Sequence, residues 1–178
     1  MTSSMDLMPK FMILDACVLI DFVNADKFVL ASITKNVGSI YVVSPVVSEV
    51  KDLENEDELT DLGVIVIEPE MEDAYIAAAE GGATSFEDKL SMLTAKRNGY
   101  VCVSNDTSLR KLCESEQVPI MWGLQLLLAL HKANGIQADD AIRIANKIHE
   151  TNPRHITQKI ITRFSVLISN QEFDGTFE

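Results

Sequence analysis

The chain has 178 residues, the length of one domain, and 47% of them are hydrophobic, so a buried core can form without disulfides or structural metal. Its 27 acidic and 15 basic residues give a net charge of −12, which argues against a generic nucleic-acid binder, because Lys and Arg supply the affinity for phosphate. No apolar run approaches the roughly 18 residues of a membrane span and the three cysteines form no CxxC pair, so we expect a cytoplasmic protein with reduced thiols and no membrane association.

Five short apolar runs, rich in β-branched residues, predict buried strands. They are Phe11–Leu14, Ile40–Val43, Val64–Ile67, Val101–Val103 and Pro119–Met121. The runs are continuous rather than alternating, which is typical of strands covered on both faces. Helical patterns separate them, and this alternation indicates parallel strands joined by right-handed crossovers. We therefore predict an α/β fold with three layers, α/β/α, in which the central sheet is parallel and C-terminal helices follow.

Capping residues place the predicted helices. Ser44 followed by Pro45 predicts a helix through Val46–Leu53. Ser85 as N-cap and Gly99 as the stop predict a helix to Asn98. Further helices are expected at Thr107–Glu116 (capped by Asn105 or Asp106), after Gly123, at Ala138–Glu150 and at Ile156–Ser169. The acidic stretch Lys51–Asp61 is expected to be a solvated loop or a fraying helix end. We assign residues 11–134 to an α/β domain and 135–170 to a helical extension packed on it.

Charge is distributed unevenly along the chain. Residues 1–142 carry 23 acids and 10 bases, whereas residues 143–178 carry 4 acids and 5 bases. Within Arg143–Arg163, Glu150 is the only acid. This basic stretch is a candidate for contact with an RNA backbone or an acidic partner, and solvated helix faces are the alternative.

Four carboxylates are predicted to meet at one edge of the sheet. Asp15 directly follows the first strand, and Asp106 comes shortly after the fourth. Glu49 lies in the helix after the second strand, and Asp88 lies in the first turn of the helix that leads into the fourth. In an open parallel sheet, ligands bind outside the carboxyl ends of the strands, where an antiparallel helix also begins. The four acids are therefore expected to converge there.

Converging carboxylates repel one another, and some stay protonated at neutral pH unless a cation is present. Oxygen donors without His or Cys suit Mg²⁺ or Mn²⁺, which can support metal-assisted phosphodiester hydrolysis. Each acid also has a structural alternative, since Asp88 and Asp106 can cap helices and Glu49 can face solvent. Asp15 is the hardest to explain in that way, because an ionised carboxylate among apolar residues is costly unless it is paired, hydrogen-bonded or metal-bound.

The sequence around these acids resembles the PIN-domain family. Ile13–Ile20 is similar to the opening of PIN domains, an Asp after the first strand followed by small residues and an apolar helix start, and Ser48–Val50 resembles the second acidic position. The family's run of Asp, helix Ala, Gly, strand and Ser/Thr-x-Asp/Asn is matched by Asp88, Ala95, Gly99, Ser104 and Asp106. This spacing selects Asp88 over Glu87. Leu109–Leu128 is similar to a PIN subgroup with a C-terminal helical extension.

The resemblance implies a Mg²⁺- or Mn²⁺-dependent ribonuclease with RNA as substrate. Asp15, Asp88 and Asp106 would be metal ligands, Glu49 would complete the site or bind a second ion, and Ser104 would support it by hydrogen bonding. Many PIN proteins are VapC-like toxins, so a homodimer held inactive by an antitoxin protein is also implied. Cys17 is a departure, because the family often has a hydroxyl or amide residue there, and the acidity of the body is another.

Two other functions compete with this reading. A catalytically silent PIN-like module that binds protein or RNA is the main alternative, because the fold also hosts binding-only members. A DNA-directed nuclease would use the same chemistry. Zinc, P-loop and Ser-His-Asp motifs are absent from the sequence, and an Asp-x-Asp phosphatase would need an acid in place of Cys17. Lys51, Arg97 and Arg110 are candidates for phosphate contact, with ordinary surface charge as the alternative.

Overall fold

The computed structural model describes residues 8–53, 56–79 and 81–170. Its centre is a five-stranded, fully parallel sheet with the strand order β3-β2-β1-β4-β5. The strands are β1 (Phe11–Leu14), β2 (Ser39–Val43), β3 (Ile65–Ile67), β4 (Val101–Val103) and β5 (Ile120–Met121). The five predicted strands are confirmed, and β1 lies in the middle of the sheet.

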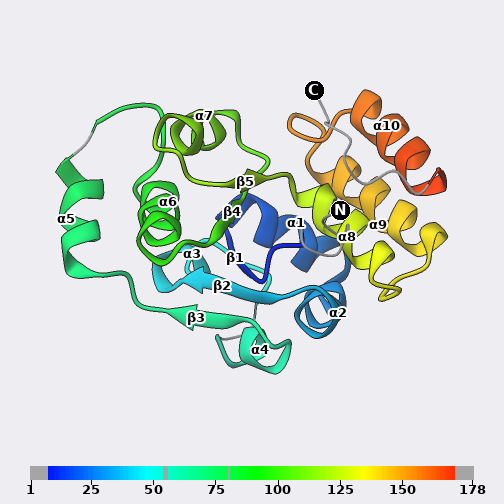
Figure 1. The fold of residues 1–178 in the computed structure, drawn as a ribbon, viewed down its shortest axis with the longest axis horizontal. Coiled ribbons are helices and arrows are strands. Elements are labelled where there is room, and N and C mark those ends of the chain that lie inside the picture. The colour runs from blue at the N-terminus through cyan, green and yellow to red at the C-terminus, as the bar shows by residue number, and fades with distance from the viewer. Residues whose placement is uncertain (1–7, 54–55, 80, 171–178) are drawn as a thin grey trace, which may run out of the picture.

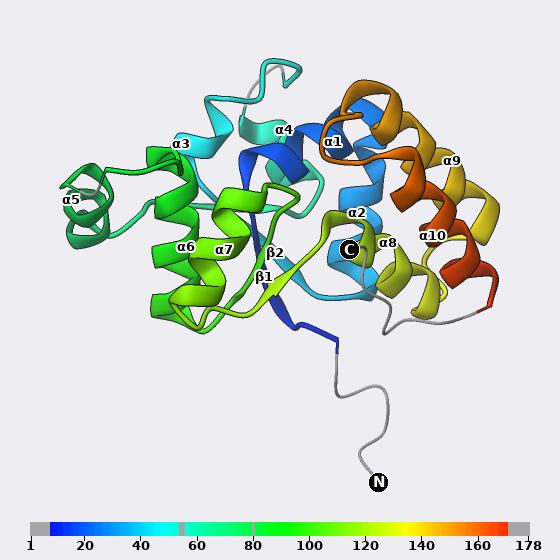
Figure 2. The same cartoon turned by 90° about the horizontal axis from the view of Figure 1, so that it is seen from above.

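Helices cover both faces of this sheet, so the predicted three-layer α/β/α fold is confirmed (Figure 1). Figure 2 shows α6 and α7 on one side of the sheet and α1, α2 and α8 on the other. The helices are α1 (Ala16–Asp26), α2 (Phe28–Asn36), α3 (Ser44–Val47), α4 (Glu56–Asp61), α5 (Met71–Ala79), α6 (Phe86–Asn98), α7 (Thr107–Ser115), α8 (Gly123–Lys132), α9 (Ala138–Thr151) and α10 (Gln158–Ser169). None of the helices in the described part of the chain is long and apolar enough to cross a membrane.

Local capping chemistry explains where several helices begin and end. The Ser85 hydroxyl accepts a hydrogen bond from the Asp88 backbone N–H at 3.1 Å and caps α6. Gly99 ends α6 in the left-handed conformation, at φ 69°, which glycine adopts without a steric penalty. Asp106, rather than Asn105, caps α7. Thr157 caps α10, which therefore begins two residues later than the predicted start at Ile156.

The predicted helix Val46–Leu53 is wrong, because α3 ends at Val47. Beyond it the backbone makes the short i to i+3 bonds Glu49 N–H to Val46 C=O and Val50 N–H to Val47 C=O, both 3.1 Å. β-Branched valines, which have low helix propensity, occupy this segment. Ser44 is not the N-cap either, since its hydroxyl instead donates to Glu68 at 2.7 Å.

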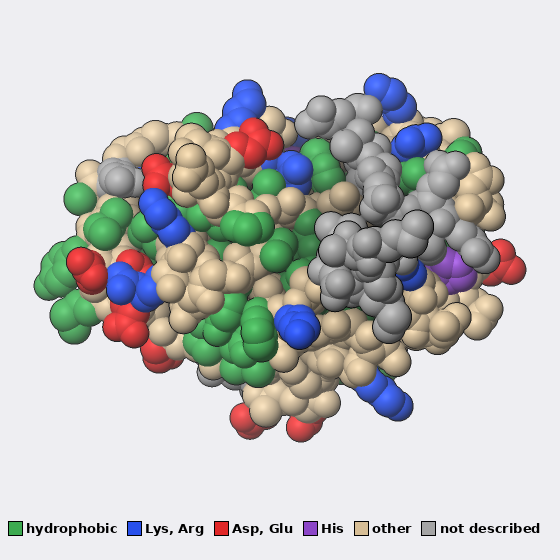
Figure 3. Space-filling view, viewed as in Figure 1, with side chains coloured by type: hydrophobic (Ala, Val, Ile, Leu, Met, Phe, Trp, Pro, Cys, Tyr) green, Lys and Arg blue, Asp and Glu red, His purple; other side chains and the backbone are tan. Residues whose placement is uncertain are grey.

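Two of the described helices, α4 and α5, lie between α3 and α6 along the chain. The acidic stretch Lys51–Asp61 contains α4, and its residues 54 and 55 lie outside the described part. Helix α5 has no counterpart in the sequence prediction and exposes the apolar side chains of Met71 and Tyr75, which are 73% and 72% exposed. Apolar side chains reach the surface at the end of the molecule where α5 lies (Figure 3).

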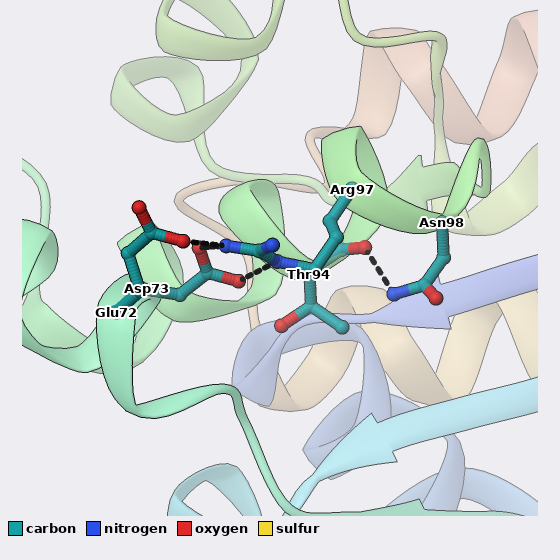
Figure 4. Close-up of polar contacts among 5 residues, drawn as sticks. All are labelled: Glu72, Asp73, Thr94, Arg97 and Asn98. Carbon is teal, nitrogen blue, oxygen red and sulfur yellow. Dashed lines mark hydrogen bonds and ion pairs between the residues drawn. The ribbon is translucent and has the colours of Figure 1, made fainter.

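Arg97 ties α5 to α6 (Figure 4). Its guanidinium donates from Nε and Nη2 to the two carboxylate oxygens of Asp73, at 2.9 and 2.6 Å, and from Nη2 to Glu72 at 2.9 Å. Asp73 is buried, and these hydrogen bonds raise the pKa of Arg97 above its usual value. Arg97 also lies nine residues after Asp88 on the same helix, about 13 Å along its axis. The suggestion that Arg97 contacts phosphate is therefore not supported, because its guanidinium holds α5 in place.

The last two helices pack against the α1 side of the domain. Helix α9 contacts α1 and α8, and α10 contacts α9 and α8. The buried side chains of both helices, such as Ile148 and Phe164, belong to the same hydrophobic core as the strands. Figure 2 shows the turn between α9 and α10 beside α1. The segment from Ala138 to Ser169 is thus in contact with the element that follows β1.

Candidate active site

Asp15 occupies the end of the central strand and the N-cap of α1. Its side chain is fully buried. Its Oδ1 accepts a hydrogen bond from the Val18 backbone N–H at 2.8 Å, and its Oδ2 accepts one from the Ser104 hydroxyl. The Asp15 backbone N–H donates to Val103 C=O of β4 at 3.2 Å. The carboxylate is therefore held in place by two neighbouring strands and a helix.

Burial raises the pKa of Asp15 from 3.8 to about 8. The hydrogen bonds from Ser104 and Val18 act in the opposite direction, and the charges of Asp88 and Asp21 raise the pKa further. Without a compensating cation, this carboxyl group is mostly protonated at neutral pH. A bound cation would favour its ionised form.

Ser104 and Asp106 belong to the loop between β4 and α7. The Ser104 hydroxyl donates to Asp15 and accepts from the Asp106 backbone N–H at 2.9 Å, so it links two of the four acids. Asp106 Oδ1 accepts from the Leu109 N–H at 2.9 Å, which confirms its capping role. The Ser104 C=O accepts a hydrogen bond from Arg110 at 3.2 Å, and the Arg110 guanidinium lies 3.7 Å from the centre of the Trp122 ring. Of the basic residues considered for phosphate contact, Arg110 is thus beside the acids.

Asp88 and Glu49 lie in the same electrostatic neighbourhood. The pKa of half-buried Asp88 is raised by partial burial first and then by the charges of Asp106 and Glu87. The pKa of exposed Glu49 is raised by partial desolvation and then by Glu87 and Asp88. Asp15 in turn interacts with Asp88. Asp15, Glu49, Asp88 and Asp106, which we call the acidic edge, therefore influence one another. Glu87 is a fifth acid beside them.

The acidic edge offers only carboxylate oxygens, a donor set that suits Mg²⁺ or Mn²⁺. Burial and then neighbouring acids raise the pKa values of Asp15, Asp88 and Glu49, and a divalent cation beside these groups would offset both effects. Within the described residues, however, no three His, Cys, Asp or Glu side chains come close enough together to hold one ion. The acidic edge fits the metal by the chemistry of its donors and by its place at the carboxyl edge of the sheet.

Sequence reasoning missed a second buried carboxylate. Asp21, on α1, is 4% exposed and accepts hydrogen bonds from Asn105 and Asn152. Burial raises its pKa to about 6, against the effect of these two hydrogen bonds. Cys17 lies in the first turn of α1, between the N-cap Asp15 and Asp21, and burial, followed by electrostatic interaction with these two acids, raises the pKa of its thiol. The signal in the sequence was an acid inside the apolar run of α1.

The five bases of the stretch Arg143–Arg163 differ in their contacts. Lys147 donates to the Ala25 C=O at 3.1 Å, and Arg143 forms an exposed ion pair with Asp140 at 3.0 Å. The other three bases, Arg154, Lys159 and Arg163, are exposed in or after the turn between α9 and α10. Of these three, Arg154 lies in the turn between α9 and α10, which is beside the helix that Asp15 caps (Figure 2), and the other two lie on α10.

No protein-family model matches the chain, and the comparison with curated proteins gives no match. Among solved structures, the chain is similar to a PilT N-terminus domain protein from the hyperthermophilic archaeon Sulfolobus solfataricus P2. The two share 16% sequence identity with a TM-score of 0.45, and the match covers 71% of this chain and 96% of the other. At this level of similarity no residue role is transferred from that protein.

Proposed function

We propose that the chain is a PIN-type ribonuclease that depends on Mg²⁺ or Mn²⁺. The observation that carries the proposal is Asp15, a fully buried carboxylate at the end of the central strand. It is oriented by Ser104 and interacts with the charge of Asp88. A buried acid with a raised pKa beside further acids is costly to maintain and is characteristic of functional sites.

Each residue has a role in this proposal. Asp15, Asp88 and Asp106 would hold the ion, and Glu49 would complete the site or hold a second ion. The Ser104 hydroxyl fixes the orientation of Asp15 and, through the Asp106 N–H, the start of α7. A bound divalent ion supplies a water ligand of lowered pKa and stabilises negative charge on the phosphate.

The biological setting is part of the same proposal. By its resemblance to VapC-like proteins, we infer a cytoplasmic toxin of a toxin–antitoxin pair, homodimeric and bound by an antitoxin protein. The exposed apolar side chains of Met71 and Tyr75 on α5 support an interaction with a protein partner. Residues 11–134 would form the nuclease domain, and residues 135–170 its helical extension.

A catalytically silent PIN-like module that binds protein or RNA is the second candidate. Two observations favour it. Both carboxylate oxygens of Asp15 accept hydrogen bonds from within the protein, and the described acids do not converge to ion-binding distance. Such a module would gain little stability from a divalent ion.

Cleavage of a fluorescently labelled single-stranded RNA, with Mn²⁺, with Mg²⁺ and with EDTA, tests the proposal. Asp106→Asn is the informative variant, because Asn also caps helices well and should keep α7 while removing the charge. Asp139→Asn, an exposed acid on α9, is the matched control. We expect metal-dependent cleavage that falls at least about 100-fold in Asp106→Asn, as for the loss of a group that stabilises the transition state, and stays unchanged in the control. Full activity of Asp106→Asn would reject the site, and absence of cleavage under all metal conditions would favour the silent module.

A further inference from the structure

Asn152 links the helical extension to α1, the helix that Asp15 caps. Asn152, directly after α9, donates from Nδ2 to both carboxylate oxygens of Asp21, at 3.0 and 3.2 Å, and lies 3.4 Å from the Cys17 sulfur. Its backbone is fixed on both sides, since its N–H donates to Ile148 C=O at 2.8 Å and its C=O accepts from Ile156 N–H at 3.0 Å. The amide is therefore aimed at α1 by the end of the helix that carries it.

Asp21 is also hydrogen-bonded to the loop that carries Ser104 and Asp106. Asn105, the residue between them, donates from Nδ2 to Asp21 at 3.0 Å. Its Oδ1 accepts from the Gly123 N–H at 3.0 Å, at the start of α8. A chain of hydrogen bonds thus leads from Asn152 through Asp21 to Asn105, the centre of the Ser104–Asp106 loop.

The contacts of Asn105 are buried and those of Asn152 are partly buried, which makes both sensitive to the loss of a partner. Asp21 is 4% exposed and Asn105 is 3% exposed. A buried carboxylate that loses a donor retains the full desolvation cost, so the two amides and the acid fix one another. Packing is tight as well, because a Cβ at Gly123 would lie 3.1 Å from Asn105 Nδ2. The loop therefore has little freedom while Asn152 is in place.

We propose that Asn152 is a positioning residue, through which the C-terminal extension sets the Ser104–Asp106 loop and so completes the active site. Its effect on cleavage rests on the proposed ribonuclease function, whereas its effect on the loop does not. Asn152 itself touches no reacting atom. It acts through Asp21 and Asn105 on Ser104, which orients Asp15, and on Asp106.

The test compares Asn152→Ala with Asn146→Ala in the full chain. Asn146 is a matched control on α9, because its amide donates to the Ile142 C=O of its own helix at 2.8 Å. The first readout is amide hydrogen exchange of the segment 101–112, without metal. The second is kcat and KM for RNA cleavage in Mn²⁺, at a temperature where melting curves show both variants to be folded.

We expect faster exchange of the segment 101–112 in Asn152→Ala and no change in Asn146→Ala. We also expect kcat to fall at least about tenfold with KM unchanged, since misplaced catalytic groups lower the rate more than they weaken binding. Unchanged exchange in Asn152→Ala would overturn the inference whatever the activity. Faster exchange with a kcat equal to that of Asn146→Ala would overturn the positioning role. A wild type that cleaves no RNA would instead contradict the proposed function, and exchange would still decide whether Asn152 positions the loop.

Discussion

Replacement of Asp15 by Asn should stabilise the metal-free protein at neutral pH. The pKa of Asp15 is 3.8 in the unfolded reference state and about 8 in the folded state. Between these pH values the folded protein keeps a proton that the unfolded chain has released, so the free energy of unfolding falls as the pH rises. Asn is neutral at every pH and its side-chain oxygen can still accept from the Val18 N–H, so the variant lacks this loss.

The size of the effect follows from the same pKa values. Each pH unit between the unfolded pKa of 3.8 and the folded pKa costs about 1.4 kcal/mol, so the loss at pH 7 is about 4 kcal/mol. Asn offers Ser104 an amide in place of a carboxylate oxygen, which removes about 1 kcal/mol of that gain. A net stabilisation of about 3 kcal/mol corresponds to a rise of roughly 10 °C in melting temperature for a chain of this length.

The assay is urea unfolding in EDTA at pH 5, 6, 7 and 8, for the wild type, Asp15→Asn and the control Asp139→Asn. Asp21 and Asp88 also have raised pKa values, and the part of their contribution that does not depend on the charge of Asp15 cancels in the difference between wild type and variant. We expect this difference to grow by about 1.4 kcal/mol for each pH unit up to pH 7 and to be absent in the control. A variant less stable than the wild type at pH 7, or a difference independent of pH, would contradict a raised pKa for Asp15 in the folded protein.

Three further predictions follow from particular contacts. Gly123→Ala should lower the free energy of unfolding by about 1 to 3 kcal/mol, because the added Cβ overpacks this site, and it should slow cleavage. Gly81→Ala, which has open space around it, should do neither. Equal urea midpoints for the two variants would contradict this prediction. Arg97→Ala should speed amide exchange in α5, because buried Asp73 loses its hydrogen bonds. Unchanged exchange there would argue against a role of Arg97 in holding α5 in place. If the three exposed bases of Arg143–Arg163 contact RNA, the logarithm of affinity should fall with the logarithm of salt concentration with a slope of about −2, and a flat dependence would exclude that contact.

Those parts of the fold that depend on residues close together in the sequence could be predicted. The β-branched runs identify the strands, and Ser85 and Gly99 mark the limits of α6, because propensity and capping act within a few residues. Parallel pairing follows from strand–helix alternation, and with it the position of Asp15 at the carboxyl end of β1. Helix α5 was missed because Arg97, 24 residues from Asp73, holds it in place.

Some contacts of the candidate site could be predicted in the same way, and others could not. The capping role of Asp106 follows from a local signal in the sequence. Its link to Asp15 through Ser104 follows from the neighbouring positions of β1 and β4 in the sheet. The pair Asp21 and Asn152 is separated by 131 residues, and no local pattern indicates that these side chains meet. Ion-binding geometry also depends on the rotamers of half-buried and exposed acids, which a one-dimensional pattern does not encode.

The most direct test of the central claim is a thermal melt of the wild type and Asp15→Asn, first in EDTA and then in millimolar Mn²⁺. Binding that is selective for the folded state must raise the melting temperature by mass action. We expect a clear rise for the wild type and none for Asp15→Asn. The absence of a shift in the wild type, or an equal shift in both proteins, would contradict a divalent-ion site at the acidic edge.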